Sequence, residues 1–157
     1  MLVGLFILSI AANRPSTNHS GLRSRTRPSP GMAWSDAGHY AKEANDIDLL
    51  IAFVKSDVPE ARKIGAEILC QAEPSEKLLN IWALELSDSD SELQYRGFLS
   101  IYKAAKKLGY KPHKDLPIMP GWEHFKEQPD YYTNIWRAWW EENRGAMMNK
   151  AGGNNPS

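Results

Sequence analysis

The sequence contains only one cysteine, Cys70, and this excludes an intrachain disulfide. Cys70 follows Ile68 and Leu69 in a helical pattern, so we expect a small buried hydrophobe rather than a reactive thiol. The N-terminal apolar run, residues 2–12, is shorter than the roughly 20 residues that a membrane-spanning helix needs. No stable membrane span is therefore predicted.

Acidic residues are missing from positions 1–31, where four of the arginines lie. From Met32 onward, 15 basic and 19 acidic residues give a formal net charge of −4. Nucleic-acid binding depends largely on neutralising phosphates, so this mildly acidic body argues against a nucleic-acid partner. The charge distribution does not exclude a protein or a small-molecule partner.

Signatures of common catalytic sites are also missing. There is no Gly-rich phosphate loop and no Gly-x-Ser-x-Gly elbow. His113, Asp115, Glu123 and His124 are the only cluster with metal-ligand chemistry, but their spacing matches no recognised site. We therefore expect no enzyme, no cofactor and no metal, with a small enzyme centred on the His113/His124 loop as a minor alternative.

The N-terminal segment 1–31 is interpreted either as signal-peptide-like or as a disordered stretch that precedes the true start at Met32, with a membrane-anchoring or structural role as the remaining alternative. Residues 2–12 have the length of a signal-peptide core, and Ser9-Ile10-Ala11 supplies small residues for cleavage, but the basic region normally in front is missing. Residues 13–31 are rich in Arg, Ser, Pro and Gly. A signal peptide predicts a secreted or periplasmic protein, whereas Met32 as the true start predicts a cytoplasmic one.

Two helix pairs are predicted after a short helix over residues 37–44, in which Tyr40 is expected to be buried. Asn45 or Asp46 caps the first helix of the first pair, and Asp57 and Glu60 form a capping box for its second helix. The stripe residues expected to be buried in this pair are Leu49, Leu50, Phe53, Val54, Ala61, Ile64, Gly65, Ile68 and Leu69.

The second pair repeats this order of caps and stripes. Ser75 caps one helix, and Ser89 with Glu92 opens the next, which Gly109 ends. The expected buried residues are Leu78, Leu79, Trp82, Leu86, Leu93, Gly97, Phe98, Ile101, Ala105 and Leu108. One constant offset places Leu50 on Trp82 and Gly65 on Gly97. A period of this length, with two helices per unit, favours a helical solenoid.

The segment SDVPEARKIGAEIL resembles the second helix of a HEAT repeat, which commonly opens with Asp, Pro and an acidic residue followed by Arg. Asp57, Pro59, Glu60 and Arg62 occupy these positions, whereas the second pair has Ser91 and Gln94 in place of the Pro and the Arg. This resemblance implies stacked helix pairs that present an extended surface to a partner.

The C-terminal part differs in character. Residues 110–121 hold three prolines and no period, so we expect an extended crossing, followed by one turn over Trp122–Lys126. Asp130 caps a last helix that Gly145 is expected to end. Its string IWRAWWEENRG resembles the Trp-Arg-x-Trp-Trp tail of secreted bacterial HEAT-repeat proteins. We expect Trp136, and at least one of Trp139 and Trp140, to be structural.

The sequence therefore predicts an all-α protein, a short α-solenoid of two HEAT-like helix pairs over residues 32–144 with a Trp-rich capping helix and a disordered tail at 145–157. The predicted function is a non-catalytic protein–protein interaction or scaffold module. The alternative is a secreted carbohydrate-binding accessory protein that uses exposed tryptophans. The candidate partner-binding residues are Lys107, Lys111, His113, Trp122 and Trp139.

Overall fold

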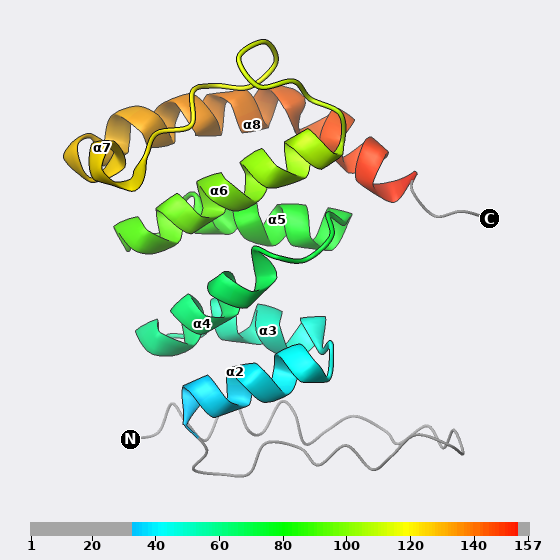
Figure 1. Cartoon of the computed structure of the whole chain (residues 1–157), viewed down its shortest axis with the longest axis vertical. Helices are drawn as coiled ribbons and strands as arrows, with labels where there is room; N and C mark the ends of the chain where they lie inside the picture. The colour runs from blue at the N-terminus through cyan, green and yellow to red at the C-terminus, as the bar shows by residue number, and fades with distance from the viewer. Residues whose placement is uncertain (1–32, 154–157) are drawn as a thin grey trace. The chain divides into compact units, whose positions relative to one another are not determined.

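The computed structural model describes residues 33–153, and this part of the chain is all-helical, as predicted, with seven helices and no strand (Figure 1). The signal-peptide and start-site predictions, and the last four residues of the predicted tail, lie outside the described residues. The chain divides into two compact units, of which the first ends at Ile68 and the second begins at Leu69. The helices are α2 Trp34–Glu43, α3 Ile47–Val54, α4 Pro59–Leu69, α5 Glu76–Glu85, α6 Ser91–Lys107, α7 Trp122–Glu127 and α8 Pro129–Gly152.

The first unit contains α2, α3 and almost all of α4. Asp46 caps α3 as predicted, because its side chain accepts a hydrogen bond from the backbone N–H of Leu49 at 3.0 Å. The prediction that Tyr40 is buried was wrong: α2 buries Ala37, Gly38 and Ala41 instead. Because Gly38 has no side chain, Ile64 of α4 approaches α2 closely at that position. Tyr40 lies to the side of this packed face and is only half-buried.

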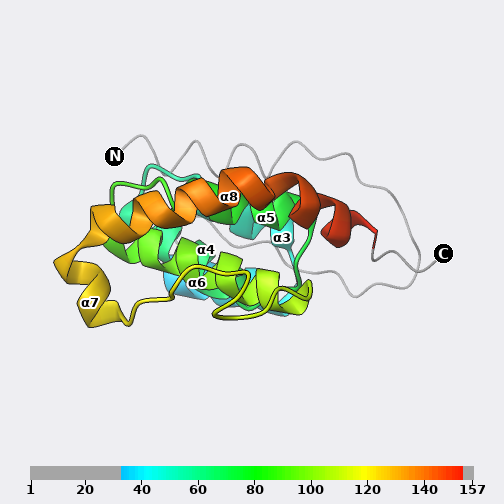
Figure 2. The same ribbon diagram turned by 90° about the horizontal axis from the view of Figure 1, so that it is seen from above.

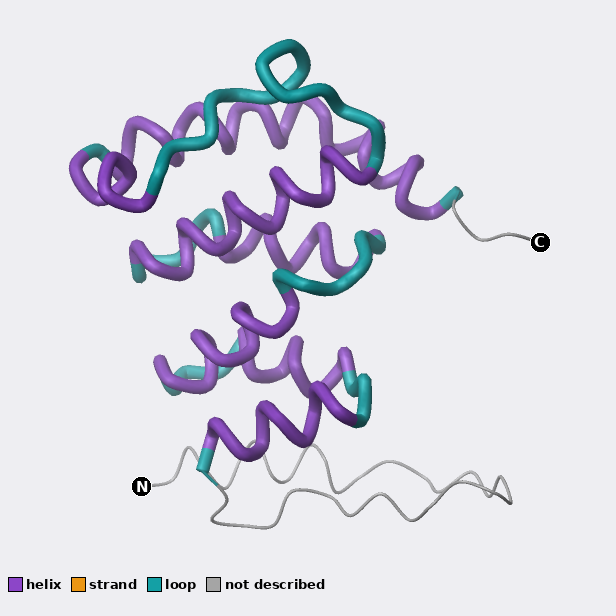
Figure 3. The backbone as a smooth tube through the Cα atoms, viewed as in Figure 1, coloured by secondary structure: helices purple, strands orange, loops and turns teal. Residues whose placement is uncertain are grey.

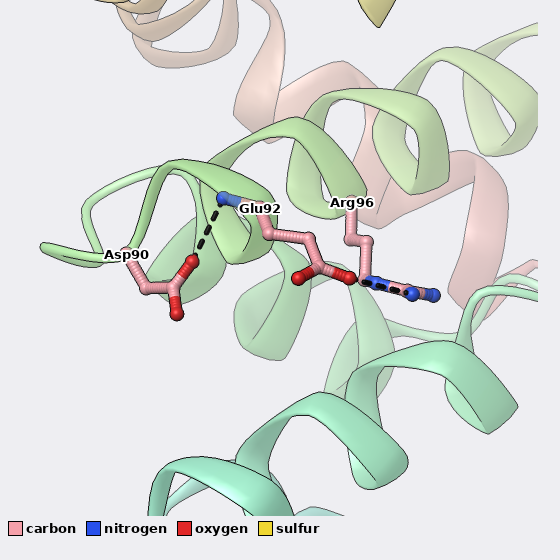
Figure 4. Close-up of polar contacts among 3 residues, drawn as sticks. All are labelled: Asp90, Glu92 and Arg96. Carbon is pink, nitrogen blue, oxygen red and sulfur yellow. Dashed lines mark hydrogen bonds and ion pairs between the residues drawn. The ribbon is translucent and has the colours of Figure 1, made fainter. Parts of the chain in front are cut away.

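The second unit opens with α5 and α6. Ser75 caps α5 as predicted, accepting from the N–H of Leu78. The prediction of Ser89 as the cap of α6 was wrong, because Asp90 takes this position and accepts from the N–H of Glu92 at 2.8 Å (Figure 4). The carboxylate of Glu92 pairs with Arg96 at 3.0 Å, one helical turn along α6.

The two predicted glycines make matching close approaches, each within its own unit. A Cβ on Gly65 would lie 2.8–2.9 Å from the carbonyl oxygen of Leu50 and the backbone nitrogen of Val54. A Cβ on Gly97 would lie 2.7–2.9 Å from the carbonyl oxygen of Trp82 and the backbone nitrogen of Leu86. The contacted positions keep the offset that relates the two glycines. In both pairs the second helix touches the backbone of the first through a residue without a side chain.

Helix α8 lies along α5 and α6 in the second unit (Figures 1 and 2). Trp136 and Trp140 are buried, as predicted, and the ring of Trp136 packs edge-on against Phe98 at 5.8 Å. The segment after Gly109 crosses the unit as a loop (Figure 3), and the indole N–H of Trp136 donates to the carbonyl oxygen of Ile118 in this loop at 3.3 Å. The aromatic side chains of α8 therefore hold the crossing against the helices.

The ends of α8 differ from the prediction. Asp130 lies in the first turn, and the helix begins at Pro129 without a side-chain cap. Gly145 does not end the helix, which continues to Gly152, so residues 145–152 are helical rather than part of a disordered tail. The buried side chain of Met147 explains this, because its packing outweighs the roughly 1 kcal/mol that glycine costs in a helix interior. None of the helices between residues 33 and 153 is both long and apolar enough to span a membrane.

Candidate functional site

An open pocket of about 400 Å³ lies in the second unit, between the C-terminal half of α8 and the segment that follows α6. The pocket is lined by Gly109, Tyr110, Asp115, Trp139, Glu142, Asn143 and Lys150.

The end of α6 places Tyr110 in the wall. Gly109 has a φ of +90°, and the N–H groups of Gly109 and Tyr110 donate to the carbonyl oxygens of Lys106 and Ala105. This is the Schellman arrangement, in which a glycine in the left-handed region reverses the chain after a helix. The prediction that Gly109 terminates the helix is confirmed, and the reversal fixes the ring of Tyr110 beside α8.

A turn over residues 111–115 fixes the second wall. The carboxylate of Asp115 accepts from the backbone N–H of Lys111 at 2.8 Å, and the N–H of Asp115 donates back to the carbonyl oxygen of Lys111 at 2.9 Å. The carbonyl oxygen of Asp115 also accepts from the indole N–H of Trp139 at 2.7 Å. Asp115 is therefore held by its backbone and side chain together.

Helix α8 supplies the remaining wall. Trp139, Glu142 and Asn143 share one face because Glu142 and Asn143 follow Trp139 by about one helical turn. The ring of Trp139 is half-buried and meets Tyr110 edge-on, with 5.7 Å between ring centres. The side-chain amide of Asn143 donates to the carbonyl oxygen of Trp139 at 2.9 Å. Only Glu142 of these three side chains is exposed.

The charges of the lining combine two carboxylates, Asp115 and Glu142, with one ammonium, Lys150. Burial, and then the negative charge of Asp115, raise the pKa of Tyr110, so its phenol stays neutral at physiological pH. None of the lining residues is a serine, cysteine or histidine. The lining suits the binding of a ligand better than nucleophilic chemistry.

The predicted partner-binding residues fall in four places. Trp139 lines the pocket, while Lys111 and His113 lie in the turn that holds Asp115, where His113 is exposed with a φ of +61°. Lys107 is exposed on α6 and forms an ion pair with Glu73 at 2.7 Å. Trp122 lies away from the pocket lining, on α7, in a separate aromatic cluster.

In that cluster Trp122 stacks on the buried Phe125, with 6.0 Å between ring centres, and contacts Tyr95 at 5.2 Å. The hydroxyl of Tyr95 donates to the carbonyl oxygen of Pro120. These contacts give Trp122 a structural role in fixing α7 and the end of the crossing.

The pocket residues that sequence reasoning missed are Tyr110, Asn143 and Lys150, and it did not connect Asp115 with Glu142. Positions 139, 142, 143 and 150 share one helical face, which the predicted stop at Gly145 cut off before Lys150. A predicted helix that continued through Gly145 would have placed Lys150 on the same face as the other three positions.

Two buried ionisable side chains of the described residues, those of Cys70 and Glu85, lie outside the pocket lining. Cys70 is buried, as predicted, and burial raises the pKa of its thiol, although Lys103 and Arg96 oppose this. Glu85 is only 2% exposed, and neither carboxylate oxygen has a hydrogen-bond partner among the described residues. Burial raises the pKa of Glu85 to about 8, with Arg96 opposing the rise and Asp88 adding to it.

Comparisons with known proteins found no relative of this chain. No protein-family model matches it, and the searches of curated proteins and of solved structures found no match. Within residues 33–153, no three His, Cys, Asp or Glu side chains gather in a way that could hold a metal ion. The chemistry of the pocket is therefore the main guide to function.

Proposed function

We propose that this protein is a non-catalytic protein–protein interaction module whose partner binds at the pocket beside Trp139. The supporting observation is the pocket wall, where Tyr110 and Trp139 are fixed by backbone hydrogen bonds beside the carboxylates of Asp115 and Glu142. Tyrosine and tryptophan dominate the binding energy of many interfaces, because they offer large rigid contact areas. Residues already fixed in place lose little entropy when a partner binds.

The proposed scaffold is a short α-solenoid of two HEAT-like helix pairs. The matching contacts of Gly65 and Gly97, whose partners are related by the same offset as the glycines themselves, support this interpretation because repeated units keep the same internal packing. The helix α8 then acts as the cap of the last pair, since Trp136 and Trp140 cover α5 and α6.

A secreted carbohydrate-binding protein is the second candidate, and the aromatic and carboxylate lining of the same pocket favours it. A sugar ring stacks on an open aromatic face, however, and two tryptophans of α8 are buried. Trp139 is half-buried, and its indole N–H already donates to Asp115. A protein partner fits these restrictions better.

The test is capture of the full-length protein from its source, with mass spectrometry of the bound proteins and of its own N-terminus. Wild type is compared with Glu142→Lys and with Glu141→Lys, its matched control. Both glutamates are exposed neighbours on α8, but only Glu142 lines the pocket. We expect the same partner with wild type and Glu141→Lys and at least a tenfold loss with Glu142→Lys. Capture of the same partners by both variants would show that the pocket is not the binding site. The N-terminus found by mass spectrometry identifies the compartment.

A further inference from the structure

The chain already places a cation of its own in the pocket. The ammonium of Lys150 lies 4.1 Å from the centre of the Tyr110 ring and donates a hydrogen bond to the carbonyl oxygen of Leu108 at 3.2 Å. An aromatic face and a carbonyl at a helix C-terminus both attract positive charge. Lys150 is exposed on the last turns of α8, and within residues 33–153 its ammonium is held by these two contacts, which a competing cation can replace.

The carboxylates leave an excess of negative charge beside this cation. Asp115 and Glu142 together carry two negative charges against the single positive charge of Lys150. Neither carboxylate forms an ion pair with any residue between 33 and 153. The pocket therefore offers two carboxylates without an ion-pair partner among these residues, of which Asp115 also accepts the backbone N–H of Lys111, next to an aromatic face that tolerates a cation.

We propose that the pocket binds a cationic side chain of the partner protein, an arginine in preference to a lysine, and that Lys150 occupies the same ring face until the partner displaces it. This inference rests on the proposed function and adds the chemistry of the contact. A guanidinium is planar, stacks on aromatic rings and donates to two carboxylates at once, which an ammonium does less well. Tyr110, Asp115 and Glu142 supply these three contacts.

An anionic partner is less consistent with the surroundings. The basic side chains nearby on α6 are already engaged, since Lys107 pairs with Glu73 and Lys106 lies over the ring of Tyr102 at 5.4 Å. Lys111 donates only its backbone N–H to the carboxylate of Asp115, and its side chain is not part of the pocket lining. Binding of an anion is an opposing outcome of the test.

The test is an NMR titration of the ¹⁵N-labelled full-length protein, followed at the indole N–H of Trp139. The ligands are blocked arginine amide and blocked citrulline amide, which has nearly the same shape without the charge. We expect arginine to move this resonance and citrulline to bind about tenfold more weakly, the combined effect of a cation–π contact and an exposed ion pair.

Variants identify the groups involved. Lys150→Gln should tighten arginine binding about two- to fivefold, because it vacates the ring of Tyr110. Glu142→Gln should weaken binding by a few-fold, whereas Glu141→Gln should leave it unchanged. Equal effects of arginine and citrulline, an unmoved Trp139 resonance, tighter binding of inorganic phosphate or of an oligosaccharide, or weaker binding by Lys150→Gln would each overturn the inference.

Failure of this inference differs from failure of the proposed function. If a captured partner depends on Glu142 but arginine and citrulline act alike, the interaction site stands and the cationic contact is wrong. If no partner depends on Glu142, the interaction site itself is wrong, whatever arginine does.

Discussion

Gly97→Ala and Gly65→Ala should each lower the free energy of unfolding by about 3 kcal/mol, the upper end of the usual cost of overpacking. The new Cβ would lie within 3 Å of two backbone atoms of the neighbouring helix in both cases. A backbone cannot turn aside as the end of a flexible side chain can, so the two helices must separate. The helix propensity of alanine, roughly 1 kcal/mol better than that of glycine, offsets only part of this cost.

Gly145→Ala is the matched control for both variants. Gly145 also lies inside a helix, but a Cβ there would meet nothing within 4 Å. We expect Gly145→Ala to raise the free energy of unfolding by about 0.5–1 kcal/mol. Urea denaturation of the three variants and wild type measures these values. Near-neutral effects at Gly65 and Gly97 would show that the helices do not approach as described.

Glu85→Gln should remove a strong pH dependence of stability, on the order of 5 kcal/mol in total. The pKa of Glu85 is raised from 4.5 to about 8, and each pKa unit corresponds to about 1.4 kcal/mol. Between these two values the folded protein holds a proton that the unfolded chain has lost. The contribution of Glu85 is therefore complete below about pH 4.5, declines as the pH rises, and is lost above about pH 8.

Urea denaturation of wild type and Glu85→Gln between pH 5 and 9 measures this effect. Glutamine has nearly the shape of the protonated glutamic acid, so the two proteins should have similar stability at pH 5. The variant should be more stable at pH 9, by several kcal/mol. Glu76→Gln, an exposed change on the same helix, should follow wild type throughout. Parallel curves for wild type and Glu85→Gln would mean that Glu85 is not a buried, proton-binding group.

Much of the fold was predictable because local rules and tertiary packing agree there. The caps at Asp46 and Ser75, the buried Leu50, Phe53 and Trp82, and the left-handed Gly109 all follow from residue type and spacing. At each of these positions, the residue type and the neighbouring sequence indicate a single structural role.

The errors occurred where two local rules compete or where packing decides. Ser89 and Asp90 are both good caps, and only the turn geometry selects Asp90, whose N–H is bound by Asp88. Gly145 is a helix terminator by propensity, but the buried Met147 beyond it keeps the helix intact. The pocket depends on this extension and on the crossing, so its residues come from two separate segments, 109–115 and 139–150, whose meeting no local pattern encodes.

The most direct test of the proposed site is the effect of the captured partner on the six tryptophan indole N–H resonances of the ¹⁵N-labelled protein. Trp139 lines the pocket, whereas Trp34 lies in the first unit against Phe53. We expect the partner to shift or broaden the Trp139 resonance and to leave that of Trp34 unchanged. A partner that binds while the Trp139 resonance stays in place would contradict the proposal that this pocket is the binding site.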